Sequence, residues 1–84
     1  MANILVGLQH GIVTFDSSIA GLGGCPYAPG ASGNVATEDV VYMMDGLGIN
    51  TGISLDDLVP VGHYISDALG RPNGSKVCTI LPLL

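Results

Sequence analysis

The sequence contains almost no basic residues. Residues 1–70 hold neither Lys nor Arg, Arg71 and Lys76 are the only two such cations, and the net charge is −5. Proteins that bind nucleic acid need cations to face the phosphates, so we expect no nucleic-acid partner. An anionic substrate that meets residues 1–70 must be held by backbone N–H groups, by a metal ion or by residues outside this chain.

Long apolar runs and a disulfide framework are also missing. No run approaches the roughly eighteen apolar residues of a membrane span, and the N-terminus lacks the basic region of a signal peptide, so we expect no membrane segment. The two cysteines are Cys25 in a glycine-rich stretch and Cys78 in an apolar tail. They do not suggest a disulfide framework and indicate a reducing compartment.

Charged residues of either sign are scarce. They make up 11% of the chain, whereas hydrophobic residues make up 48%. This charged fraction is less than half of the roughly 25% usual in soluble domains. A free-standing domain of 84 residues exposes much of its surface and should be more polar. The composition therefore predicts one part of a larger structure, completed by the remainder of a barrel or by another chain.

The N-terminal segments read as a helix followed by a strand. Residues 1–11 are expected to be the end of a helix, because apolar residues recur at helical spacing and Gly11 suits the position after a helix. The helix has no N-cap, which indicates a preceding segment. Residues 12–16 are mostly β-branched or aromatic and are expected to form a strand. No second strand is evident, so its hydrogen-bonding partners must come from elsewhere.

A second helix is predicted over residues 35–47. Asn34 can act as its N-cap, and two acidic residues fall in its first turn, where the helix dipole favours anions. Gly48 is expected to end it. One apolar stripe is predicted to face the core, formed by Ala36, Val40, Met43, Met44 and Leu47.

An appended helical segment is predicted over residues 54–69, with Ser54 as N-cap. Pro60 interrupts it, so we expect a kink or two short helices. Residues 70–84 are a turn and an apolar tail without an assigned structure. The order of helix, strand, loop and helix is typical of a β/α architecture, in which residues after a strand's carboxyl end carry the chemistry.

Residues 17–34 form a glycine-rich loop at that position. Its glycines permit positive φ and close approach of the backbone to a ligand: Gly21, Gly23, Gly24, Gly30 and Gly33. Cys25 could be an acid, base or nucleophile with a lowered pKa, or an inert apolar side chain. Asn34 could bind a hard cation through its oxygen or only cap the helix.

Four further polar side chains lie at positions where a role in a site is conceivable. Asp16, at the end of the strand, could bond loop N–H groups or face a site, and Glu38 is a supporting candidate beside the loop. His10 is expected to complement a helix C-terminus, and His63 to lie on a solvated helix face. No metal-ligand spacing joins either histidine to another ligand.

The segment from Asp16 to Met43, "DSSIAGLGGCPYAPGASGNVATEDVVYM", closely resembles the active-site signature of the 3-hydroxy-3-methylglutaryl-CoA lyase family. The similarity covers about residues 2–77. It implies an α/β fold, namely the C-terminal fragment of a TIM (β/α)8 barrel. Residues 12–16 would be the last barrel strand, 17–34 the glycine loop, 35–47 the last barrel helix and 54–69 an appended helix.

The resemblance also implies chemistry. The family cleaves 3-hydroxy-3-methylglutaryl-CoA to acetyl-CoA and acetoacetate with Mg²⁺ or Mn²⁺. Cys25 matches its catalytic cysteine and Asn34 its metal-ligating asparagine. The family's other metal ligands, an aspartate and two histidines, and its catalytic arginine have no match in this chain, and neither His10 nor His63 corresponds to those histidines. We therefore expect the 84-residue chain alone to be inactive.

Two other functions stay open on the sequence. Isopropylmalate and homocitrate synthases share a pattern matched here by Gly21, Gly23, Gly33, Asn34 and Glu38, but typically lack the insert that carries Cys25. The second open function is a non-catalytic one, in which a truncated product acts only in assembly. A homo-oligomer is compatible with both functions. The "ALGRPNGSKV" end looks bacterial, which implies a cytoplasmic protein; a eukaryotic one would be mitochondrial.

Overall fold

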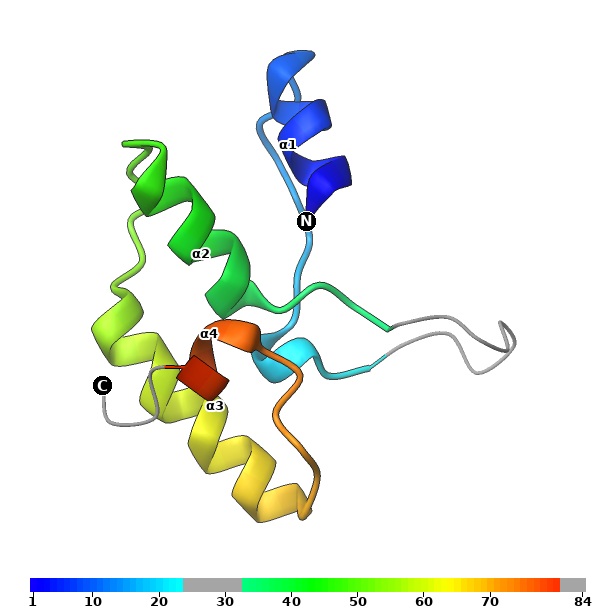
Figure 1. Ribbon diagram of the computed structural model, residues 1–84, viewed down its shortest axis with the longest axis vertical. Helices are drawn as coiled ribbons and strands as arrows, with labels where there is room; N and C mark the ends of the chain where they lie inside the picture. Colours follow the sequence, from blue (N-terminus) through cyan, green and yellow to red (C-terminus); the bar gives the residue numbers. More distant parts are fainter. Residues whose placement is uncertain (24–32, 81–84) are drawn as a thin grey trace.

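The computed structural model describes residues 1–23 and 33–80. The described chain contains α1 (Ala2–Gln9), the short 3-10 helix η1 (Ile19–Gly21), α2 (Thr37–Gly46), α3 (Leu55–Leu69) and α4 (Lys76–Ile80). Helices α2, α3 and α4 pack against one another and η1 packs on α2 and α3, while α1 lies at one end of the molecule, away from this cluster (Figure 1). None of the described helices is long and apolar enough to cross a membrane.

The expected strand is not formed in the described chain. Residues 13–17 have no assigned secondary structure, and no bond to another backbone group is recorded for them. The physical reason is that a strand needs a neighbouring strand, and no described segment pairs its backbone with residues 13–17. Its one β-like contact comes directly afterwards, where Ser18 and Ala36 form an isolated parallel bridge.

Helix α1 agrees with the helix expected within residues 1–11. Its C-terminal turn is closed by His10, whose ring nitrogen Nδ1 bonds the carbonyl of Val6 at 2.9 Å. The expectation that His10 complements a helix C-terminus is confirmed. Below this turn the side chain of Phe15 packs against the backbone of Gly7, since a Cβ placed there would lie 3.2 Å from Phe15 Cε1.

Helix α2 is shorter than predicted, and its buried face matches the predicted stripe only in part. Its N-cap is Ala36, so the prediction that Asn34 caps the helix is wrong. Ala36 and Met44 of the predicted apolar stripe are buried, as expected, whereas Leu47 is half exposed. Glu38 and Val41 are buried although the stripe did not include them. The stripe was assigned from hydrophobicity alone, which cannot anticipate that a glutamate occupies a core position. Gly48 follows the helix with a φ of +77°, as expected of a terminating glycine.

Helix α3 runs as one helix through Pro60, so of the two expected outcomes, a kink or two short helices, the division into two helices is wrong. Pro60 cannot donate to the carbonyl of Asp56, but Asp56 lies in the exposed first turn, where water can replace the missing donor. The helix turns its buried face toward α4, where Val59 packs against Val77 and Cys78. Helix α4 itself was not anticipated within the predicted tail, and residues 81–84 lie outside the described residues.

Gly62 lets α3 approach the rest of this core. A Cβ at Gly62 would overlap the Glu38 carboxylate and would lie 3.2 Å from Cys78 Sγ. The interior of a helix ordinarily disfavours glycine by about 1 kcal/mol relative to alanine, so its use here indicates that close packing dominates.

We predict that Gly62→Ala lowers the free energy of unfolding, by about 1–3 kcal/mol, because Glu38 and Cys78 must move to admit the methyl group. Gly46→Ala is the matched control, since nothing lies within 4 Å of a Cβ at that helical position. It should leave stability unchanged or raise it by up to about 1 kcal/mol. Urea unfolding followed by circular dichroism measures both, and equal effects would contradict the packing explanation.

Candidate functional site

The two arms of the glycine loop are joined where they leave the body of the protein. The amide of Ser18 donates to the carbonyl of Val35 at 3.0 Å, and the amide of Thr37 donates to the carbonyl of Ser18 at 2.9 Å. The side chains add a further contact, since the hydroxyl oxygens of Ser17 and Thr37 are 2.7 Å apart. The end of the predicted strand therefore lies beside the start of α2, as Figure 1 shows.

Further along the arms, glycines allow backbone to touch backbone. We call Gly21, Leu22, Gly23, Gly33 and Asn34 the glycine clasp. A Cβ at Gly33 would lie 3.3 Å from the carbonyl oxygen of Gly23, and one at Gly21 would lie 3.4 Å from that of Asn34. All three glycines have positive φ, between +69° and +88°. The clasp therefore depends on both the small size and the conformational freedom of these residues.

Asn34 lies exposed in the clasp with a defined side-chain orientation. Its Nδ2 donates to the carbonyl of Leu22 at 2.9 Å, which identifies the other amide atom as the oxygen Oδ1. An amide oxygen is a ligand that Mg²⁺, Mn²⁺ and Ca²⁺ accept. Asn34 thus fits a hard cation as one ligand, while the described residues contain no cluster of three or more His, Cys, Asp or Glu side chains that could complete a site.

Only some of the other predicted site residues lie in the described part of the chain. Cys25, Gly24 and Gly30 lie outside the described residues. Asp16 is exposed, and no hydrogen bond is recorded between it and the described part of the loop, so its role stays a prediction. His63 is half-buried, not solvated: its Nε2 is buried without a hydrogen-bond partner among the described residues.

Glu38 is completely buried directly behind the clasp. Both of its carboxyl oxygens lie 2.9 Å from the backbone nitrogen of Ala20, which donates to them. The thiol of Cys78 donates to Oε2 at 3.3 Å. Ala20 is the one described non-glycine residue with positive φ, at +58°, a conformation that costs alanine about 1 kcal/mol or more. Glu38 helps to hold this strained residue in place, so it supports the loop rather than facing its outside.

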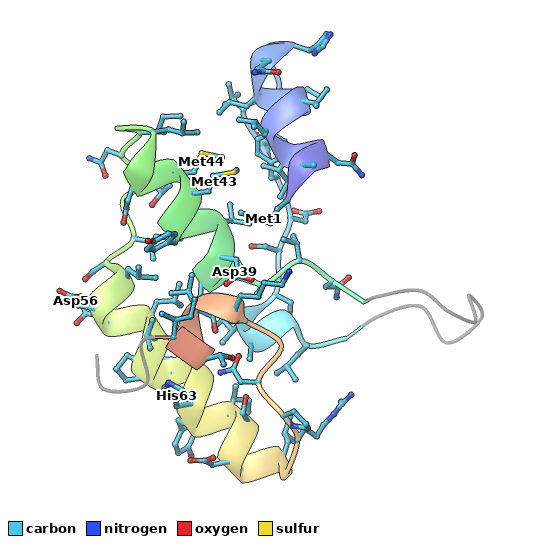
Figure 2. All side chains as sticks on the ribbon, in the orientation of Figure 1. Met1, Asp39, Met43, Met44, Asp56 and His63 are labelled. Carbon is cyan, nitrogen blue, oxygen red and sulfur yellow. The ribbon has the colours of Figure 1, made fainter. Side chains whose placement is uncertain are left out.

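The neighbouring acid, Asp39, bonds the start of α4 instead of the loop. Its Oδ1 accepts hydrogen bonds from the hydroxyl of Ser75 at 2.7 Å and from the amide of Val77 at 3.0 Å, and its Oδ2 accepts one from Lys76 N at 3.2 Å. Figure 2 shows Asp39 beside the start of α4. The sequence predicted Asp39 only as a favourable charge near a helix N-terminus, since no local signal indicates partners nearly forty positions away.

The C-terminal segment also reaches the loop directly. The amide of Gly74 donates to the carbonyl of Ala20 at 2.8 Å, and a Cβ at Gly74 would lie 2.6 Å from that oxygen. Both backbone polar groups of Ala20 are therefore bonded, one to Glu38 and one to Gly74. The C-terminal segment, predicted as a turn and a tail without an assigned structure, therefore contributes to the support of the glycine loop.

An open apolar cleft of about 430 Å³ separates residues 13–17 from α2. Its lining includes Val13, Phe15, Val40, Val41, Met44 and Ile53. Met43 and Met44 lie on the side of α2 that faces α1 and the segment after it (Figure 2). Val13 is 84% exposed. An apolar cleft beside a stretch of backbone without a recorded partner in the described part of the chain is unusual for a complete domain and favours a structure that continues on this side.

Comparisons with known proteins agree on one family. The model of the HMGL-like family matches residues 1–65. A mitochondrial hydroxymethylglutaryl-CoA lyase from Arabidopsis thaliana is 67% identical over 81 residues, which are 96% of this chain and 17% of that protein. The mitochondrial enzyme from Homo sapiens is 60% identical over 77 residues, 92% of this chain and 24% of that protein.

Solved structures give the same result. The crystal structure of hydroxymethylglutaryl-CoA lyase from Pseudomonas aeruginosa matches 96% of this chain with a TM-score of 0.89 and 54% identity. An HMG-CoA lyase from Acinetobacter baumannii, solved with coenzyme A and 3-methylmalate, matches 93% with a TM-score of 0.86 and 42% identity. This chain covers 27% and 26% of those two chains, so it spans about a quarter of the length of its solved relatives.

The buried thiol predicts a pH dependence of stability. Burial raises the pKa of Cys78, the adjacent Glu38 carboxylate acts in the same direction, and the hydrogen bond with Ser75 opposes them. The folded state therefore holds this proton more tightly than the unfolded state. The stability linked to it is fully present below the thiol's ordinary pKa of 9.0 and is lost as pH rises above it.

We therefore predict that the free energy of unfolding falls more between about pH 8 and about pH 10 in the unmodified chain than in Cys78→Ala. Other groups that titrate in this range, including the remaining cysteine, are common to both proteins and cancel in the comparison. Urea unfolding at the two pH values measures the difference. An equal fall in both proteins would contradict the assignment of this pH dependence to Cys78.

Proposed function

This chain belongs to the HMGL-like family, and on that premise we propose that it is the C-terminal part of a hydroxymethylglutaryl-CoA lyase. The observation that carries the proposal is identity of 60–67% to named lyases from Homo sapiens and Arabidopsis thaliana over nearly the whole chain. The relatives named above are all lyases, which favours this function over the isopropylmalate and homocitrate synthases.

Within a (β/α)8 barrel, we assign residues 12–16 to the last strand, 17–34 to the glycine loop, 35–47 to the last barrel helix and 54–69 to the appended helix. The apolar cleft and the unbonded backbone of residues 13–17 support this assignment, because neighbouring barrel strands would cover both. The remaining barrel strands would come from the part of the relatives that this chain does not match, whether on the same polypeptide or on another.

The reaction assigned to the whole enzyme is cleavage of a carbon–carbon bond. A base takes the proton of the tertiary hydroxyl, the electron pair of the broken bond passes to the enolate of acetyl-CoA, and the hydroxyl carbon becomes the ketone of acetoacetate. An acid then protonates the enolate carbon. Cys25 is proposed as a proton-transfer group in this sequence. Acyl-CoA as substrate is supported by the coenzyme A in the relative from Acinetobacter baumannii.

Asn34 is proposed as one ligand of the divalent cation, Mg²⁺ or Mn²⁺, through the oxygen that its bond to Leu22 leaves available. When bound, the cation would stabilise the oxygen charges that develop during cleavage. Glu38 and Asp39 lie behind the clasp and bond to protein groups, so we assign them to holding the loop and α4. The compartment follows the source of the protein: cytoplasm in a bacterium, mitochondrion in a eukaryote.

The proposal is tested by grafting. In a chimera, this chain replaces the matching quarter of the Pseudomonas aeruginosa lyase, and release of acetoacetate is measured with Mg²⁺ present. We predict that the chimera cleaves 3-hydroxy-3-methylglutaryl-CoA and that the 84-residue chain alone does not, because the chain supplies a single cation ligand.

Two variants of the chimera separate the cysteines. Cys25→Ser should lower kcat by about 10²–10⁴-fold if this thiol transfers a proton, while Cys78→Ser, a change behind the loop, should affect thermal stability more than kcat. A folded chimera without lyase activity, or cleavage by the isolated chain, would contradict the proposed function.

A further inference from the structure

The orientation of the Asn34 amide depends on a short contact with the opposite arm of the clasp. Its Nδ2 donates to the carbonyl of Leu22 at 2.9 Å, across twelve positions of the sequence. The residue is exposed, so burial does not restrict its rotamer. Among the described residues this hydrogen bond is the one recorded for the side chain, and it determines which amide atom faces the protein.

Gly23, next to Leu22, leaves the space that this amide occupies. A Cβ built on Gly23 would lie 2.7 Å from Asn34 Nδ2 and 3.9 Å from its Cγ. The first distance is shorter than real Cβ contacts, so any side chain at position 23 must displace the amide. Gly23 also has a φ of +88°, which side chains rarely adopt.

We propose that Gly23 is a positioning residue for Asn34: its missing side chain lets the amide bond the Leu22 carbonyl and thereby fixes the direction of Oδ1. This inference rests on the proposed function, in which Oδ1 is a cation ligand. The geometry requires two separate conditions at one position, positive φ and empty space beside Nδ2. Substitution by alanine violates both, so the experiment must separate them.

Gly11 supplies the matched control for backbone strain. Its φ is +89°, almost equal to that of Gly23, and nothing lies within 4 Å of a Cβ built on it. Gly11→Ala therefore introduces comparable strain in the backbone without touching Asn34. An effect that appears in Gly23→Ala and not in Gly11→Ala belongs to the contact with the amide.

The first measurement uses the chimera described above and its affinity for Mn²⁺, read from the electron paramagnetic resonance signal of the free ion. Gly23→Ala should weaken Mn²⁺ binding by about 10–100-fold, the range typical when the orientation of a metal ligand is lost. Gly11→Ala should change it less than about twofold. In an Asn34→Ala background, Gly23→Ala should have no further effect, because a residue that acts through Asn34 has nothing left to position.

The second measurement uses the 84-residue chain itself and needs no metal. The Nδ2 proton resonances of Asn34 in a ¹⁵N-correlated NMR spectrum should shift, and their exchange with water should accelerate, in Gly23→Ala. They should stay unchanged in Gly11→Ala. The side-chain amide of Asn3, on exposed α1, serves as an internal reference.

The two measurements distinguish failure of this inference from failure of the proposed function. If the unmodified chimera binds no Mn²⁺, the cation role of Asn34 is wrong, and the NMR comparison still decides whether Gly23 orients the amide. Unchanged Asn34 resonances in Gly23→Ala would overturn the inference. So would an equal loss of Mn²⁺ affinity caused by Gly23→Ala with and without the Asn34 side chain.

Discussion

The carboxyl group of Glu38 is completely buried. No Lys or Arg occurs in residues 1–70. A buried carboxyl group is costly unless donors surround it. Here the donors are the amide of Ala20 and the thiol of Cys78, which belong to η1 and α4, and α3 approaches through Gly62, which has no side chain. Four elements therefore meet at one side chain, and the glycine clasp begins one residue beyond Ala20.

This arrangement explains which features could be predicted from the sequence. Helices α1, α2 and α3 were predicted because periodic apolar residues and terminating glycines are local signals. The burial of Glu38 was not, because its partners Ala20 and Cys78 lie 18 and 40 positions away. Helix α4 was missed for the same reason: its N-terminus is capped by Asp39, which is distant in sequence. Pro60 was expected to interrupt the helix, but the Asp56 carbonyl that it cannot bond lies in the exposed first turn, where water can bond it.

In the candidate site, too, the features with a local sequence signal were predicted and those that depend on distant contacts were not. The residue types and glycines of the loop indicated a ligand-binding segment, and resemblance assigned roles to Cys25 and Asn34. The contact that orients Asn34 could not be inferred, since it requires Leu22 and Gly23 on one arm to face Asn34 on the other. The described chain holds the side chain of Asn34, the proposed cation ligand, in a defined orientation, and the apolar cleft beside residues 13–17 is where the remaining barrel is expected to pack.

The central claim is that the buried Glu38 carboxyl group holds the base of the loop rigidly, and amide hydrogen exchange tests it most directly. Ala20 lies in the short 3-10 helix η1, within the glycine loop and outside the α-helices, so its amide would ordinarily exchange quickly. We expect its amide to be protected about as strongly as the buried amides of α2 and α3, and far more than those of residues 13–17, for which no backbone partner is recorded among residues 1–23 and 33–80. Exchange of Ala20 as fast as that of residues 13–17 would contradict it.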